Sequence, residues 1–178
     1  DHTRAGIDVR TVFSFTKKKM AEALAVLQKV PGIEGCVLIS TCNRMELWAS
    51  TDDGFPEEGL YEQLCKIKES DPGMYRPYFV FRKEREAVQH LFWLAGGLKS
   101  RILGEDQIVT QVGEALSFAR EQYATDSVME TLFRMAVTAA KKVKTEVELS
   151  HTDNSVVRTA IDTLKEQGQT FVGKKCMV

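Results

Sequence analysis

The chain has 178 residues, of which 43% are hydrophobic and 28% charged, which predicts a single globular domain within the usual ~100–200 residues. Its 24 Lys and Arg residues nearly balance 25 Asp and Glu residues, for a formal net charge of −1, so a polyanion would have to bind a local patch. No apolar run approaches the ~20 residues of a membrane span, and no signal peptide is predicted.

The first part of the chain alternates between helical and extended patterns. Apolar residues recur at helical spacing over residues 16–30, and Pro31-Gly32 ends that helix. The run GCVLIS (35–40) predicts a buried strand, and a loop, a short helix over 60–67, a turn and a third candidate strand, YFVF (78–81), follow later. Between them RMELWAS (44–50) predicts a half-buried strand, with Met45, Leu47 and Ala49 on one face and Glu46, Trp48 and Ser50 on the other.

From Lys83 onward the pattern is helical. Ser127 is the predicted N-cap of the longest helix, with Glu130 completing a capping box, and a last helix is expected from near Ser155 to Gly168. A strand-and-helix front followed by a helical back predicts the α+β class. The three main helices carry these apolar stripes: Ala87, Leu91, Leu94 and Leu98; Ile108, Val112, Ala115, Leu116 and Ala119; Val128, Leu132, Met135, Ala139 and Val143.

The cysteines and histidines are scattered along the chain. The four cysteines form no Cys-x-x-Cys pair, and the three histidines do not cluster with them. Neither a disulfide framework nor a metal site is therefore predicted. Reduced thiols indicate a cytoplasmic protein.

Two residues in this pattern are candidates for chemistry. Cys42 lies at a predicted strand–turn–strand corner, where its side chain is exposed and the fixed positive charge of Arg44 favours the reactive thiolate. His90 lies at the predicted boundary between core and solvent and could serve as the base for a thiol nucleophile. On the residues alone, an incidental cysteine in a turn and an ordinary boundary histidine are the favoured interpretations.

Two polar patterns in the helical half are ambiguous. Gln107 and Gln111 lie one turn apart on the same predicted face and could bind a polar substrate or only solvent. The acids Glu105 and Asp106 suit the first turn of a helix. A basic helix face that could hold phosphates, or simply be solvated, carries Arg134, Thr138, Lys141 and Thr145.

Three stretches taken in order resemble the signature blocks of one family. They are STCNRMELW (40–48), AVQHLFWLAGGLKSRILGEDQIVTQV (87–112) and AAKKVKTEVELS (139–150), and the opening DHTRAGIDVR resembles a fourth block. Together they resemble glutamyl-tRNA reductase from Asp1 to about Ser150. The Thr-Cys-Asn-Arg-x-Glu and Leu-Gly-Glu-x-Gln-Ile blocks carry most of this resemblance.

The resemblance implies an activity and assigns roles by position. The family uses NADPH to reduce the glutamyl group of glutamyl-tRNA(Glu) to glutamate-1-semialdehyde through a cysteine thioester, the first step of tetrapyrrole biosynthesis from glutamate. Cys42 would be the nucleophile and His90 the general acid/base, and Arg44 would bind the substrate carboxylate. The other residues matched to substrate binding are Thr41, Ser100, Glu105, Gln107 and, less directly, Gln111.

The resemblance also implies a domain plan. Residues 1–150 would form a catalytic domain built on a ferredoxin-like βαβ sheet with helices, residues 151–170 the start of a connecting helix, and residues 171–178 the first strand of a Rossmann-type domain. Both ends of the chain look cut, and the NADPH site would lie beyond residue 178. The family further implies a homodimer formed through that later part, no membrane contact, and glutamate-1-semialdehyde aminomutase as a further partner.

Two residues depart from the family pattern. Thr11 stands where Glu is usual, and Lys99 stands where the family commonly has Asp in Gly-Leu-Asp-Ser, beside Ser100. The second departure keeps other functions open. A non-catalytic relative that binds tRNA or a partner enzyme is one alternative. An acyl-thiol hydrolase, in which water replaces hydride, is the other.

Overall fold

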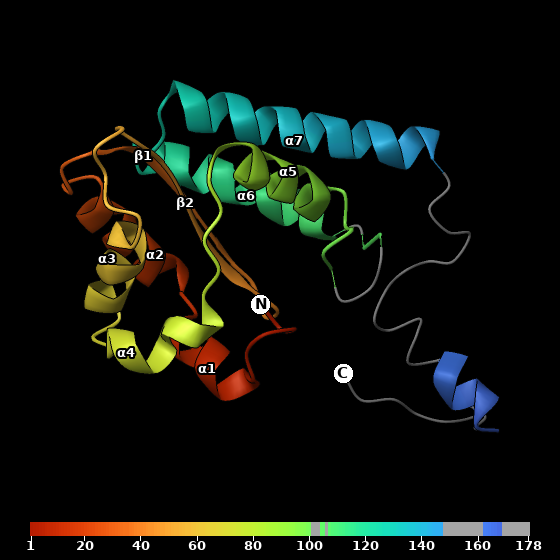
Figure 1. Ribbon diagram of the computed structural model, residues 1–178. Helices are drawn as coiled ribbons and strands as arrows, with labels where there is room; N and C mark the ends of the chain where they lie inside the picture. The colour runs from red at the N-terminus through yellow and green to blue at the C-terminus, as the bar shows by residue number, and fades with distance from the viewer. Residues whose placement is uncertain (101–103, 106, 148–161, 169–178) are drawn as a thin grey trace.

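A β-hairpin lies at the centre of the fold, with helices on both of its faces (Figure 1). The computed structural model describes residues 1–100, 104–105, 107–147 and 162–168. Strand β1 (Ile33–Ser40) pairs antiparallel with β2 (Met45–Thr51), with Cys36 opposite Ala49 and Ser40 opposite Met45. The hairpin therefore presents residues 41–44, with Cys42 among them, at its turn.

The helices form two groups (Figure 1). On one side of the hairpin lie α1 (Ile7–Val12), α2 (Lys17–Leu27), α3 (Gly59–Ile67), α4 (Pro72–Tyr75) and the 3₁₀ turn η1 (Arg76–Tyr78). On the other side α5 (Glu84–Ala95), α6 (Gln107–Glu121) and α7 (Ser127–Glu146) pack against one another. Residues 162–166 are also helical, and Gly168 follows with a positive φ of 77°.

The main core runs through the hairpin and joins both groups of helices. Leu24 and Leu27 of α2, Val37 of β1 and Phe133 of α7 are all fully buried members of it. Thr16 begins α2 by accepting a hydrogen bond from the Lys19 amide at 3.3 Å. The predicted helix over 16–30 and the first two predicted strands are thus confirmed, as is the α+β class.

The predicted third strand over residues 78–81 is wrong. Tyr78 is the last residue of the 3₁₀ turn η1, and residues 79–81 have no regular structure. Their aromatic side chains instead pack into a second apolar cluster, where the rings of Phe79 and Phe13 lie 4.8 Å apart, edge to face. Pro77 removes a backbone donor just before the run, which disfavours a strand ladder.

The strand β2 is mostly half-buried, as predicted, but its one buried side chain, Trp48, lies on the face opposite Met45 and Leu47. Trp48 is only 8% exposed, and its ring packs at 5.7 Å edge to face against Phe133 of α7. Met45 and Leu47 pack against the core from the opposite face. The alternating pattern predicted that one face of β2 would be open to solvent. The large apolar ring of Trp48 lies on that face and is buried by packing against α7.

The buried face of α7 also differs from the predicted stripe. Val128 and Met135 are 52% and 55% exposed, because the helix buries the series one residue later: Met129, Phe133, Ala136 and Ala140. Both series have helical spacing, and the series containing the large Phe133 ring is the buried one. Asp126, not Ser127, is the N-cap, since its carboxylate accepts from the Met129 amide at 2.9 Å.

The remaining predictions concern the end of α5 and the last part of the chain. Leu98 is 46% exposed, because α5 ends at Ala95 before Gly96 and Gly97. The start of the last predicted helix near Ser155 and the expected strand over 171–178 lie outside the described residues. Within the described part of the chain, every helix is too short or too polar to cross a membrane.

Candidate functional site

Cys42 is exposed at the tip of the hairpin, as predicted. The hydroxyl of Thr41 accepts hydrogen bonds from the amides of Asn43 and Arg44, both at 3.2 Å. The Thr41 amide in turn donates to the Arg44 carbonyl at 2.8 Å. Three hydrogen bonds within four residues fix the turn, so that the thiol is held on a defined backbone.

The beginning of the chain holds the same turn from outside. Arg10 of α1 donates through Nη1 to the carbonyl of Cys42 at 3.1 Å, and the amide of His2 donates to the carbonyl of Asn43 at 2.9 Å. Arg10 was not among the sequence candidates. Its position in the opening block that resembles the family was the only pattern that could have pointed to it.

A cavity of about 460 Å³ opens beside this turn. One wall is polar and carries Cys42, Thr41, Arg44, Glu46 and His90. The second wall lies on the α1 and α3 side of the hairpin and is largely apolar, with Phe13, Tyr61, Leu64, Phe79 and Phe81. Four of the predicted site residues therefore meet in one cavity, three on the turn and His90 on α5.

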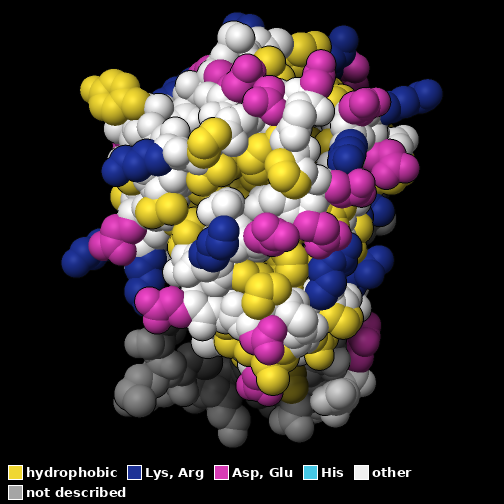
Figure 2. All heavy atoms as spheres, turned by 60° about the vertical axis from the view of Figure 1, so that its left-hand side comes forward, with side chains coloured by type: hydrophobic (Ala, Val, Ile, Leu, Met, Phe, Trp, Pro, Cys, Tyr) yellow, Lys and Arg dark blue, Asp and Glu magenta, His cyan; other side chains and the backbone are white. Residues whose placement is uncertain are grey.

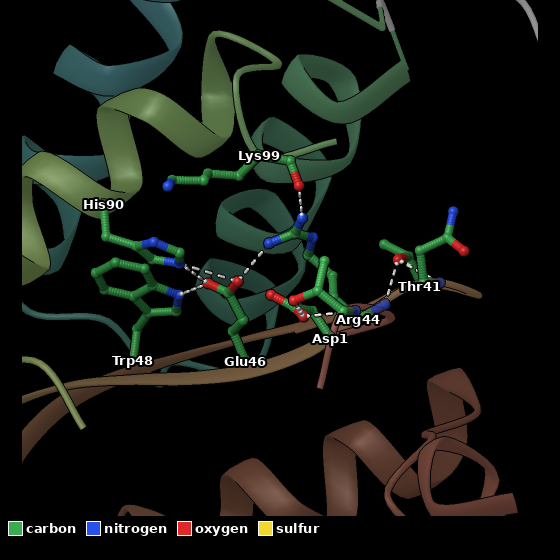
Figure 3. Close-up of polar contacts among 9 residues, drawn as sticks. Asp1, Thr41, Arg44, Glu46, Trp48, His90 and Lys99 are labelled. Carbon is green, nitrogen blue, oxygen red and sulfur yellow. Dashed lines mark hydrogen bonds and ion pairs between the residues drawn. The ribbon is translucent and has the colours of Figure 1, made fainter. Parts of the chain in front are cut away.

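Glu46 lies at the centre of the polar wall, where three side chains point toward its carboxylate (Figure 3). Arg44 Nη1 donates to it at 2.7 Å, Trp48 Nε1 at 3.2 Å and His90 Nε2 at 3.1 Å. Burial alone would raise the pKa of Glu46, but the hydrogen bond and charge of His90 and the pairing with Arg44 outweigh it and lower that pKa. Glu46 is therefore a carboxylate that accepts all three donors.

Both terminal nitrogens of Arg44 are engaged within the protein. Arg44 is 3% exposed; Nη1 pairs with Glu46, and Nη2 donates to the carbonyl of Lys99. The guanidinium thus ties the hairpin to the loop after α5. Its predicted role as the partner of a substrate carboxylate remains a prediction, and a substrate would have to compete with these contacts.

His90 is more buried than predicted. It is 8% exposed, and its ring stacks on Trp48 with centroids 5.9 Å apart and planes inclined by 15°. Because Nε2 donates to the Glu46 carboxylate, Nδ1 is the nitrogen left to accept a proton. A carboxylate that fixes the tautomer and orientation of a histidine beside a nucleophile is a recurrent catalytic arrangement.

The loop after α5 is closed by a contact between two glycines. Gly97 has φ +80°, and a Cβ there would lie 2.9 Å from Cα of Gly104. Between these glycines the carbonyl of Lys99 accepts from Arg44, while the Lys99 ammonium lies 4.8 Å from the centroid of the Trp93 ring. Lys99 contributes a main-chain oxygen to the site, so its side chain is not what anchors Arg44.

The remaining predicted residues do not line the cavity. Among the described lining residues, none is Ser100, Glu105, Gln107 or Gln111. Gln107 is exposed at the start of α6 and Gln111 is half-buried one turn later. The carbonyl of Glu105 accepts from Lys144 at 3.2 Å. They lie on the loop or on α6, and among the described residues of this loop Lys99 contacts the site through its carbonyl.

The basic face of α7 has the features of a solvated face. The hydroxyl of Thr138 donates to the carbonyl of Arg134 at 2.8 Å and that of Thr145 to the carbonyl of Lys142 at 2.8 Å, so both are occupied by the helix itself. Elsewhere, on the side that Figure 2 brings forward, which is the left-hand side of Figure 1, Lys/Arg and Asp/Glu side chains are mixed rather than segregated. The described residues also contain no group of three or more His, Cys, Asp or Glu placed to hold a metal ion.

Comparison with known proteins gives consistent matches. A family model for "Glutamyl-tRNAGlu reductase, N-terminal domain" matches residues 1–147. The chain is 45% identical to a glutamyl-tRNA reductase of Acetivibrio thermocellus and 42% identical to one of Alkaliphilus oremlandii, over 94% of this chain and 50% of each relative. It is 37% identical to a probable multifunctional siroheme biosynthesis protein of Ruminiclostridium josui, over 100% of this chain and 34% of that protein.

A solved structure shows the same fold. Glutamyl-tRNA reductase from Methanopyrus kandleri superposes with a TM-score of 0.71 at 24% identity, over 93% of this chain and 38% of that one. The chain spans about half the length of the first two curated relatives.

Proposed function

The chain belongs to the glutamyl-tRNA reductase family, matching its N-terminal domain, and we propose that it captures the glutamyl group of glutamyl-tRNA(Glu) as a thioester on Cys42. The observation that carries this proposal is the exposed Cys42 at a cavity whose polar wall also holds His90 against Glu46. A nucleophile, a base and a carboxylate that orients the base are the groups that acyl transfer needs.

The proposed chemistry is a transesterification. The thiol of Cys42 loses its proton to Nδ1 of His90, and Sγ attacks the carbonyl carbon of the ester. The bond between that carbon and the ribose oxygen breaks, and the proton on His90 passes to the leaving oxygen. The products are a glutamyl thioester and tRNA with a free 3′ terminus.

The thioester prepares the acyl group for reduction. Sulfur donates less electron density into a carbonyl than oxygen does, so a thioester accepts hydride more readily than the original ester. NADPH supplies that hydride when bound. The described residues contain no glycine-rich turn of the dinucleotide-binding kind after a strand, and we place the NADPH site beyond residue 178.

The experiment is to incubate the chain with tRNA carrying labelled glutamate. We expect label on Cys42, slow release of free glutamate and no aldehyde. Alkylation of Cys42, or Cys42→Ala, should abolish labelling, whereas Cys65→Ala is the matched control because Cys65 is a buried thiol. Label that persists in Cys42→Ala contradicts the proposal. Retained tRNA without label would indicate a binding relative, and rapid turnover without NADPH would indicate a hydrolase.

For the whole protein, family membership supports a wider set of proposals. The reaction would supply glutamate-1-semialdehyde to tetrapyrrole biosynthesis in the cytoplasm. Dimerisation would occur through a part outside this chain, and glutamate-1-semialdehyde aminomutase would be a partner because it consumes the reactive aldehyde.

A further inference from the structure

We propose that the part of the Cys42 cavity formed by α1 and residues 78–82 binds the 3′-terminal adenosine of the tRNA together with its 5′ phosphate. This inference rests on the proposed function, because it assigns a binding site to the adenosine, which is the alcohol part of the ester that Cys42 attacks. The polar wall of Arg44, Glu46 and His90 accounts for the acyl side. The apolar wall, which carries Phe13, Phe79 and Phe81, has no role in the proposed acyl transfer.

The chemistry of the ester requires such a neighbour for Cys42. The glutamyl group is joined to the ribose of the terminal adenosine, so that nucleoside lies directly beside Sγ when the carbonyl carbon is attacked. A cavity of about 460 Å³ lies within the ~300–1,000 Å³ typical of small-ligand pockets. It extends from the Cys42 turn to the aromatic wall.

Arg10 offers the phosphate a guanidinium edge next to the nucleophile. Its Nη1 donates to the carbonyl of Cys42, but its Nε is buried and has no hydrogen-bond partner. The edge formed by Nε and Nη2 is the one that binds an oxyanion with two parallel hydrogen bonds. Arg4 lines the same cavity and is exposed. Among the described residues, neither arginine pairs with a carboxylate.

The aromatic wall suits a flat base. Phe13 follows Arg10 along the chain, and Phe13, Phe79 and Phe81 all line the cavity. Tyr78, 37% exposed, lines it too and leaves a ring face available without disturbing the packing of Phe79 on Phe13. Unpaired bases are commonly bound by stacking on aromatic side chains, with arginines on the neighbouring phosphate.

The first test measures binding without acyl transfer. Adenosine 5′-monophosphate should slow alkylation of Cys42 by iodoacetamide about tenfold at saturation, and ribose 5-phosphate and orthophosphate should protect less. Arg4→Gln should weaken protection by all three, and Tyr78→Ala should remove only the advantage of the nucleotide. Arg134→Gln and the 90% exposed Tyr123→Ala are matched controls outside the cavity. No protection, or protection that both cavity variants leave unchanged, overturns the proposal.

The second test separates this inference from the proposed function. Glutamate esterified to adenosine 5′-monophosphate, to adenosine and to methanol should acylate Cys42 with kcat/KM values that fall in that order. Arg10→Lys, which keeps the charge but not the guanidinium fork, should reduce the difference between the first two. Equal rates from all three donors overturn the adenosine site and leave thioester formation standing. If no donor labels Cys42, thioester formation fails, while protection by the nucleotide still decides the binding site.

Discussion

The carboxylate of Glu46 holds the polar wall together, because Arg44, Trp48 and His90 all donate hydrogen bonds to it. Arg44 is almost completely buried, so loss of its counterion would leave a buried charge unpaired. The position of His90 depends on the same oxygen atoms. Glu46 therefore contributes both to the stability of the fold and to the orientation of His90.

Replacing Glu46 by Gln should destabilise the protein in a pH-dependent way. Near neutral pH we expect a loss of about 3 kcal/mol in the free energy of unfolding, because the pairing with Arg44 loses its negative charge. The folded-state pKa of Glu46 lies below its ordinary value of 4.5, so its contribution is present above that value and is lost as the pH falls through the folded pKa. Urea unfolding of both proteins from pH 3 to 7 should show the difference shrinking in acid. A constant difference would contradict the assignment.

Replacing His90 by Asn should affect chemistry more than tRNA binding. Loss of a general base slows acylation by about 10²–10⁴-fold, and tRNA affinity, measured by filter binding, should hardly change. Trp48→Phe keeps an aromatic ring beside His90 and removes one donor to Glu46, so it should show a much smaller effect. Equal losses in acylation and affinity for His90→Asn would indicate a structural role instead.

At the scale of elements, local pattern predicted the hairpin and the longer helices, but not the short helices α1 and α4. The exposed position of Cys42 followed from residues adjacent in sequence. Glu46 was missed because its partner His90 lies 44 positions away, and Lys99 reaches Arg44 across 55 positions. Contacts of that separation depend on how α5 docks on β2, which no spacing within either element encodes.

The face that α7 buries was mispredicted for a related reason. Two apolar series one residue apart both have helical spacing, and only packing against Trp48 and the neighbouring helices selects the one that contains Phe133. The surface against which α7 packs, and not the sequence of α7 itself, decides which face of the helix is buried. The same applies to residues 78–81, whose aromatic rings pack into the second cluster instead of forming a strand.

A pair of substitutions tests that rotation of α7. Phe133→Ala should lower the free energy of unfolding by about 3–5 kcal/mol, because it opens a cavity in the core. Met135→Ala, at a position 55% exposed, should change it by less than about 0.5 kcal/mol. Denaturant titrations of the two variants decide the question. The reverse order would restore the face predicted from sequence.

At the scale of the whole molecule, the proposed function places acyl capture and reduction in different parts of the protein. We expect NADPH added to this chain to leave the products unchanged, with glutamate released slowly and no aldehyde trapped by an amine reagent. The full-length protein under the same conditions should give the aldehyde. Aldehyde from the chain alone would place a nucleotide site within these 178 residues.

The bracing of the Cys42 turn by residues 2 and 10 separates folding from reactivity. A shortened chain starting at Thr11 would retain every fully buried side chain of both apolar clusters. Such a protein could have an unchanged melting temperature and still hold the Cys42 thiol less rigidly. Under the proposed function, an intact core is therefore no guarantee of a reactive Cys42 thiol, because residues 2 and 10 help to position it.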